Sequence, residues 1–176
     1  MTSFVIKLEW DDKAFQLGMR RLESIGADTG PLMADIAEGL LHSTQDRFNT
    51  SVAPDGTPWA PLKASTKAMK KGPRILVEEG YLSGLLRSDF GKDFAEVATA
   101  PLPYAQVQQE GGKGSYTIKP VNKEALAWPG GRHPVAGVVH PPLPARPYLG
   151  LSADDQRMIL DRCRAAVDRA FGAPAA

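Results

Sequence analysis

Proline is concentrated in one stretch of this 176-residue chain, and this concentration limits the fold more than any other feature. Seven of the 15 prolines lie between Lys119 and Tyr148. Proline lacks a backbone N–H and clashes with the preceding helical turn, so the stretch fits only an edge strand or an extended loop. Loops of this length in small domains are functional or disordered. We therefore expect a proline-rich extended hairpin arm at about residues 111–144.

The overall composition is that of an ordinary globular protein. Hydrophobic residues make up 43% and charged residues 23% of the chain, which excludes general disorder and predicts one domain over residues 1–176. Apolar runs are only a few residues long, so we expect no membrane span. The formal charge of +1 argues against a nucleic-acid-binding protein, because the affinity of such proteins comes largely from neutralising phosphates. A single cysteine, Cys163, excludes an internal disulfide, and the start of the chain resembles no secretory signal.

Apolar spacing predicts two consecutive helices in the first third of the chain. Asp11-Asp12 suit a helix N-terminus, and residues at helical spacing follow from Phe15 to Ile25. Gly26 is expected to end this helix. A second helix is expected from Gly30-Pro31 to about Phe48, because proline suits the first helical turn. Ahead of them, residues 4–10 predict an opening strand.

Later segments predict shorter elements and one further long helix. Ser152 and Asp155 resemble a capping box, and an apolar stripe from Ile159 to Phe171 follows. The remaining predictions are a turn and short helical segment at 78–88, a strand at 94–99, a short polar helix at 104–109, and two strands at 115–120 and 135–140 that pair as a hairpin. These predict a small domain of mixed helices and strands, in which the helices pack most simply on a sheet.

The chain shows no pattern typical of catalysis, of a cofactor or of a metal site. His42, His133 and His140 have no metal-ligand spacing. The glycines around Lys113 lack the spacing of a phosphate loop and precede no predicted helix. The sequence therefore predicts no enzyme, no cofactor and no metal.

A basic segment is the one charged feature that has two interpretations. Lys63, Lys67, Lys70, Lys71 and Arg74 follow one another with no acid among them. Such runs usually face water as part of a short helix and loop. The alternative is contact with DNA or with an acidic partner, which makes a nucleic-acid-binding accessory protein the second hypothesis.

Several blocks, read in order, resemble the phage virion morphogenesis family, the tail-completion proteins of Mu-like and related phages. The blocks are Arg47-Phe48, residues 54–62, residues 76–82 with Leu85 and Ser88, Tyr104-Ala105 with Gln109 and Gly111, and residues 143–152 with Asp154, Asp155 and Ile159. They cover most of the chain from Phe48 to Ile159, whereas the first 30 residues carry little resemblance. Glu79 and Tyr148 depart from the family's usual Thr and Phe.

This resemblance implies an α+β fold, with an antiparallel sheet packed by two or three helices. It also implies a structural virion protein of the phage neck or tail. Such a protein would be assembled in the host bacterial cytoplasm. It would act in tail completion or termination and in head–tail joining, as a subunit of a homo-oligomeric, hexameric ring. Its partners would be the tail tube protein and the head-closure or connector protein. DNA would pass through the lumen without sequence recognition, and no membrane is involved.

Eight residues are candidates for a protein interface, and two of them have alternative roles. Trp59 either anchors its Pro-Asp-Gly-Thr-Pro-Trp turn within the domain or contacts a neighbouring subunit. Arg146 either binds loop carbonyls or pairs with an acid. The full set of candidate interface residues is Trp59, Lys67, Lys70, Lys71, Tyr116, Ile118, Val138 and Arg146.

Overall fold

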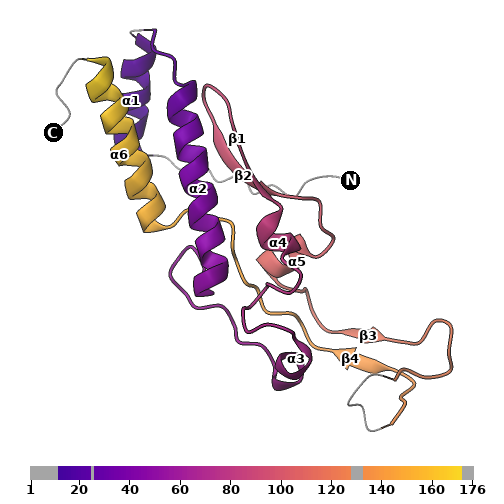
Figure 1. Ribbon diagram of the computed structural model, residues 1–176. Helices are drawn as coiled ribbons and strands as arrows, with labels where there is room; N and C mark the ends of the chain where they lie inside the picture. Colours follow the sequence, from indigo (N-terminus) through magenta and orange to yellow (C-terminus); the bar gives the residue numbers. More distant parts are fainter. Residues whose placement is uncertain (1–11, 25, 128–132, 172–176) are drawn as a thin grey trace.

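The computed structural model describes residues 12–24, 26–127 and 133–171. Figure 1 shows an elongated molecule with three long helices at one end and a small hairpin near the other. The helices are α1 (Lys13–Ser24), α2 (Gly30–Thr50), α3 (Ala64–Met69), α4 (Tyr81–Gly84), α5 (Ala105–Glu110) and α6 (Ala153–Ala170). The strands are β1 (Leu86–Phe90), β2 (Ala95–Thr99), β3 (Tyr116–Ile118) and β4 (Val138–His140). No helix within the described ranges is long and apolar enough to cross a membrane.

The helical end is a layer of helices beside a two-stranded sheet. Helix α2 lies between α6 and the antiparallel pair β1–β2, and α1 packs on α6 (Figure 1). Burial of apolar stripes forms this core, whose buried members are Leu22, Leu32, Met33, Ile36 and Ile159. The predicted helix starts are confirmed. Asp12 Oδ1 accepts bonds from the first turn of α1, proline stands in the first turn of α2, and Ser152 and Asp155 form a capping box on α6.

A second core lies between the end of α2 and helices α4 and α5. Its buried members are Phe48, Ala53, Trp59, Leu82, Leu86, Ala105, Tyr148 and Leu149. The Phe48 ring meets the Trp59 ring edge-on at 5.5 Å and the Tyr148 ring at 5.3 Å. The predicted Asp55-Gly56 turn presents Trp59 to this core. Gly56 has φ 84°, and Asp55 Oδ1 accepts a bond from the Thr57 N–H.

The second sheet is the β3–β4 hairpin, which confirms the predicted pairing of its two segments. Tyr116 faces His140 and Ile118 faces Val138, and the Tyr116 and His140 rings stack at 5.1 Å. All three residues of β3 are exposed. No helix or other strand in the described part of the chain packs extensively on this hairpin.

Three expectations need correction, and a fourth lies outside the described residues. The helical segment at 78–88 is only the single turn of α4, because from Leu86 the chain pairs with β2 as strand β1. The antiparallel strands form two separate pairs instead of one sheet, and long helices cover only the first pair. Phe171 ends the predicted stripe but is 55% exposed, because α6 ends there. The predicted strand at 4–10 lies outside the described residues.

Candidate functional site

The blocks that resemble the virion family meet around one irregular segment, residues 143–152, which we call the strap. The strap connects the β3–β4 hairpin to α6 and contains no helix or strand. Arg146, Tyr148 and Leu149 are nevertheless buried. Buried backbone N–H and C=O groups require hydrogen-bond partners, and here side chains from the other blocks supply them.

Arg47, near the end of α2, joins the strap to α6. Its Nη1 donates to the carbonyl oxygens of Tyr148 and Gly150, both at 2.9 Å. Its Nη2 lies 2.5 Å from Asp155 Oδ2, and both side chains are buried. Burial lowers the pKa of Arg47, and the charge and hydrogen bond of Asp155 oppose this shift. Arg47 therefore contacts both the strap and α6 through buried, charge-assisted hydrogen bonds.

Gln109, on α5, also binds the strap backbone. Its Oε1 accepts bonds from the N–H groups of Tyr148 and Leu149, both at 3.0 Å. Its Nε2 donates to the Leu149 carbonyl at 2.9 Å. The side chain therefore binds an irregular backbone as a neighbouring strand would. Gly111 lets this backbone approach, because it has φ 84° and a Cβ there would lie 2.9 Å from Ala145 N.

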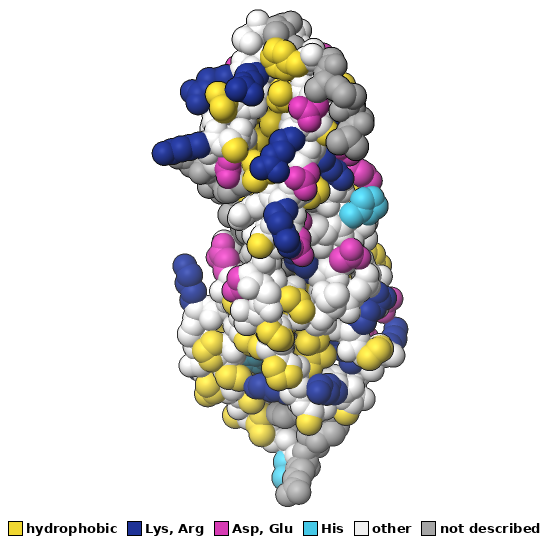
Figure 2. Space-filling model, turned by 90° about the vertical axis from the view of Figure 1, so that its left-hand side faces the viewer, with side chains coloured by type: hydrophobic (Ala, Val, Ile, Leu, Met, Phe, Trp, Pro, Cys, Tyr) yellow, Lys and Arg dark blue, Asp and Glu magenta, His cyan; other side chains and the backbone are white. Residues whose placement is uncertain are grey.

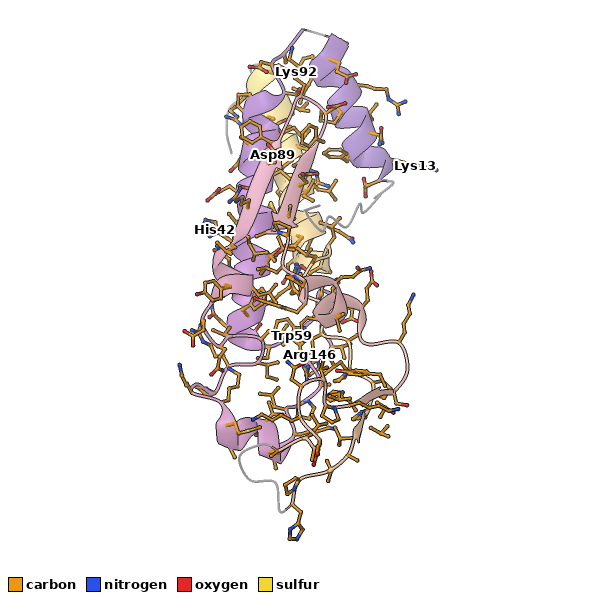
Figure 3. All side chains as sticks on the ribbon, turned by 90° about the vertical axis from the view of Figure 1, so that its right-hand side faces the viewer. Lys13, His42, Trp59, Asp89, Lys92 and Arg146 are labelled. Carbon is orange, nitrogen blue, oxygen red and sulfur yellow. The ribbon has the colours of Figure 1, made fainter. Side chains whose placement is uncertain are left out.

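Trp59 and Arg146 form hydrogen bonds between the strap and residues 59–60. Trp59 Nε1 donates to the Pro147 carbonyl at 2.8 Å, and Arg146 Nε donates to the Ala60 carbonyl at 2.9 Å. Burial lowers the pKa of Arg146. Figure 3 shows both residues within the body of the molecule, away from Lys92 at the opposite end. Each side chain is 5% exposed, so the structure gives both an internal anchoring role, the intramolecular alternative expected for Trp59.

The roles of Arg47 and Gln109 were not predicted from the sequence. Both lie in the blocks that carry the resemblance, so the sequence pointed to these positions but gave them no role. Their partners are main-chain atoms 39 to 103 residues away, and no spacing pattern predicts such contacts. Asp155 was expected only to cap α6, but it also binds Arg47.

The basic segment folds back onto two glutamates. Lys70 Nζ lies 2.7 Å from Glu78 and also donates to the Val77 carbonyl, and Lys71 Nζ lies 3.1 Å from Glu79. Hydrogen bonds from the Lys70 side chain and the Lys71 N–H lower the pKa of Glu78. Lys67 stays exposed, with no ion pair to any described residue. The free positive charge of this segment is therefore smaller than its sequence suggested.

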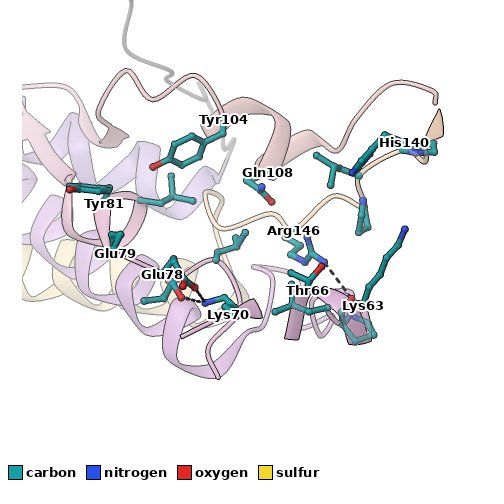
Figure 4. Close-up of a pocket in the computed structure, with 18 of the residues that line it drawn as sticks. Lys63, Thr66, Lys70, Glu78, Glu79, Tyr81, Tyr104, Gln108, His140 and Arg146 are labelled. Carbon is teal, nitrogen blue, oxygen red and sulfur yellow. Dashed lines mark hydrogen bonds and ion pairs between the residues drawn. The ribbon is translucent and has the colours of Figure 1, made fainter. Parts of the chain in front are cut away.

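A groove of about 490 Å³ lies beside the strap, between the basic segment and α5. Leu62, Leu76, Val77 and Leu143 contribute apolar wall. Figure 4 shows Tyr81 and Tyr104 toward one end of the groove and Lys63 and His140 toward the other. The lining residue Gln108 has a buried Oε1 with no hydrogen-bond partner among the described residues. The groove can hold a small apolar group or a short extended peptide.

The remaining candidate interface residues lie on the hairpin. Tyr116 is 54% exposed and Ile118 is exposed, while Val138 is half-buried. The groove and the hairpin both lie at the end of the molecule that contains the strap, which we call the strap end. Figure 2 shows that hydrophobic side chains gather over the lower half of one face, while charged side chains dominate its upper half.

The described residues contain no group of three or more His, Cys, Asp or Glu side chains placed to hold a metal ion. His140 stacks on Tyr116, and Cys163 is buried between α1 and α6, where burial raises the pKa of its thiol. Each therefore has a packing role.

Comparison with known proteins gives two findings. The model of the phage virion morphogenesis family matches residues 10–168. The putative capsid assembly protein G of Escherichia phage Mu is 28% identical over 167 residues, which cover 92% of this chain and 93% of that protein. No solved structure matches. The family match begins well before Phe48 and so includes α1, where sequence reasoning saw little resemblance.

Proposed function

The chain belongs to the phage virion morphogenesis family and has a role in virion assembly, and we propose that this role is tail completion and head–tail joining. In this proposal the protein is a structural subunit of the neck or tail and performs no catalysis. It terminates or completes the tail so that a filled head can dock. The observation that carries the proposal is the family match over residues 10–168.

The architecture supports a structural role for the matched blocks. They supply Arg47, Trp59 and Gln109, whose polar atoms bind strap backbone and Asp155. They also supply Arg146 of the strap, which donates to the Ala60 carbonyl. They build a rigid base for the hairpin, because both ends of residues 112–143 meet where Gly112 N donates to the Leu143 carbonyl at 2.9 Å. Rigid positioning of a projecting element is what a subunit contact requires.

We assign the segment at about 111–144 as an intersubunit arm in a homo-oligomeric ring of six copies. A two-stranded hairpin alone is only marginally stable in water, and this one has exposed aromatic and aliphatic side chains. The ring would contact the tail tube protein on one side and the head-closure or connector protein on the other. DNA would pass through its lumen without sequence recognition.

The name of the Mu relative supports a second candidate, a role in capsid assembly. The two roles predict different particles from a phage that lacks this gene. Tail completion predicts filled heads beside separate tails in electron micrographs of the lysate, and added purified protein should restore joined particles. Missing or aberrant heads, with normal tails, would replace our proposal with the capsid role.

Use of the basic segment for DNA binding has less support, because Lys70 and Lys71 are paired with Glu78 and Glu79. We expect weak retention of the purified protein on duplex DNA at low salt. Tight retention that falls steeply with salt would restore the nucleic-acid hypothesis.

A further inference from the structure

The β3–β4 hairpin has unpartnered faces and unpaired charge. Tyr116 is 54%, Val139 65% and Val121 92% exposed. Lys113, Lys119 and Lys123 are exposed and form no ion pair with any described residue, and Glu124 is the single acid in the described parts of 111–144. The hairpin therefore presents exposed apolar side chains and carries a net positive charge. Its natural partner is a surface that is partly apolar and acidic.

The same chain carries such a surface on the body of the molecule. A hollow of about 660 Å³ lies between the second half of α2, the turn at 52–56 and the start of α6. Its apolar lining includes Val52, Pro54 and Met158. We call this surface the acidic hollow, because three exposed aspartates line it: Asp46, Asp55 and Asp154.

The arginines that line the acidic hollow do not neutralise these aspartates. Arg47 is paired with the buried Asp155, and Arg162 is paired with Asp35. Within the described part of the chain, Asp154 pairs only with the exposed Arg157, a contact that contributes little. Asp46 and Asp55 have no ion pair with any described residue. The hollow thus keeps free negative charge, as the hairpin keeps free positive charge.

The two surfaces lie on opposite sides of the molecule. Figure 1 shows the hairpin projecting on the right, whereas the loop after α2 and the start of α6 lie to its left. A hairpin therefore cannot reach the hollow of its own chain. Contacts between two different patches of identical chains run head-to-tail, and such contacts close into a ring when the rotation permits.

We propose that the β3–β4 hairpin of one copy docks on the acidic hollow of a second copy, with Lys119 and Lys123 facing Asp46 and Asp55. This inference rests on the proposed ring and names its subunit contact. The exposed hairpin side chains cover Val52, Pro54 and Met158 while the lysines meet the aspartates around them. The partner is a second copy of this chain because the two surfaces are complementary in charge and unreachable within one copy.

Charge reversal in complementation assays tests the contact. Changing Lys119→Glu with Lys123→Glu should reduce the yield of joined particles at least tenfold, because acid then faces acid. Adding Asp46→Lys and Asp55→Lys to the same chain should restore most of the yield. The matched control adds Asp89→Lys and Asp161→Lys, two exposed aspartates outside the hollow, and should restore nothing. Full yield from the first variant, no rescue by the hollow, or equal rescue by the control would each overturn the proposal.

Cross-linking gives a second readout that does not depend on joining. In a Cys163→Ala background, Lys119→Cys with Asp55→Cys should form disulfide-linked oligomers in assembled particles. The control pair Lys119→Cys with Asp89→Cys should stay monomeric on the gel. Absence of oligomers from the first pair in particles that contain the protein would overturn the hairpin–hollow contact. Such a result would not contradict the proposed joining function. Conversely, a head defect in a phage that lacks the gene would overturn the joining function, but the cross-linking result could still be interpreted.

Discussion

The helical end and the strap end of this molecule both enclose an apolar core, but they satisfy their buried backbone in different ways. In α1, α2 and α6, the main-chain N–H and C=O groups bond within each helix, and apolar stripes do the packing. In the strap, Tyr148, Leu149 and Gly150 lie in no helix or strand. Side chains of Arg47 and Gln109 bind their main-chain atoms.

This difference predicts how each end tolerates substitution. Removing an apolar group from the helical core removes contacts and leaves a small cavity. Removing a polar side chain that binds the strap also leaves buried donors and acceptors unpaired, which costs their full desolvation penalty. Polar substitutions at the strap end should therefore lower the free energy of unfolding more than conservative apolar substitutions at the helical end.

Replacement of the buried arginine should have the largest effect. Arg47→Met keeps much of the side-chain volume but leaves Asp155 buried without its cation and two strap carbonyls without a donor. We expect the free energy of unfolding to fall by about 3–5 kcal/mol, measured by urea denaturation. The control is Arg157→Met, which removes an exposed pair with Asp154 and should cost about 0–1 kcal/mol. If the two variants lost equal free energy of unfolding, the buried pair would contribute no more to stability than an exposed one.

Replacement of the strap-binding glutamine should come next. Gln109→Leu removes three bonds to the backbone of Tyr148 and Leu149, and we expect a loss of about 3 kcal/mol in the free energy of unfolding. Hydrogen exchange should also show faster exchange at the two strap N–H groups. Gln106→Leu is the matched control on the same helix, since its side chain is exposed and binds only Glu110. A stable Gln109→Leu variant with protected strap amides would contradict the role assigned here.

The two ends also differed in how far the sequence predicted them. Helix starts at Asp12, Gly30-Pro31 and Ser152 were predicted correctly, because capping and apolar period are local signals. The pairing of the two strand-like segments as a hairpin was predicted, whereas the register that places Tyr116 opposite His140 was not. Leu86 was the main local error, since pairing with Thr99 overrides the short helical pattern before it.

The strap could be located but not explained from the sequence. The resemblance marked Arg47, Gln109 and Arg146, yet nothing in their local pattern shows that they bind carbonyls or N–H groups in distant segments. Lys70 and Lys71 were expected to stay free because no acid lies within their run. Glu78 and Glu79, eight residues along, neutralise them once the loop folds back. Such pairings depend on tertiary structure, which periodicity does not encode.

The buried tyrosine of the strap should make this end sensitive to alkaline pH. Burial raises the pKa of Tyr148 from 10.0 to about 12. Between these values the unfolded chain releases a proton that the folded chain keeps, so the free energy of unfolding falls as pH rises from 10 to 12. Below this window both states hold the proton, and the contribution is constant.

The expected loss across that window is about 2–3 kcal/mol. It should disappear in Tyr148→Phe, which has no ionisable group, and remain in Tyr116→Phe, whose ring is exposed. Urea unfolding below pH 10 and near pH 12 measures both. An identical alkaline loss in the parent and in Tyr148→Phe would mean that another group causes it.

The smallest effect is expected from a conservative change at the helical end. Ile36, on α2, is 3% exposed and packs with Leu32, Met33 and Ile159 in the helical core. Ile36→Val removes one methylene from this core but leaves every main-chain bond of α2 in place, and both residues are β-branched. We expect the free energy of unfolding to fall by about 1 kcal/mol, with no change in strap hydrogen exchange. Ile159→Val, on the facing helix, is a matched second site and should behave alike. If either variant lost as much stability as Gln109→Leu, or loosened the strap amides, the two ends would form one tightly coupled core.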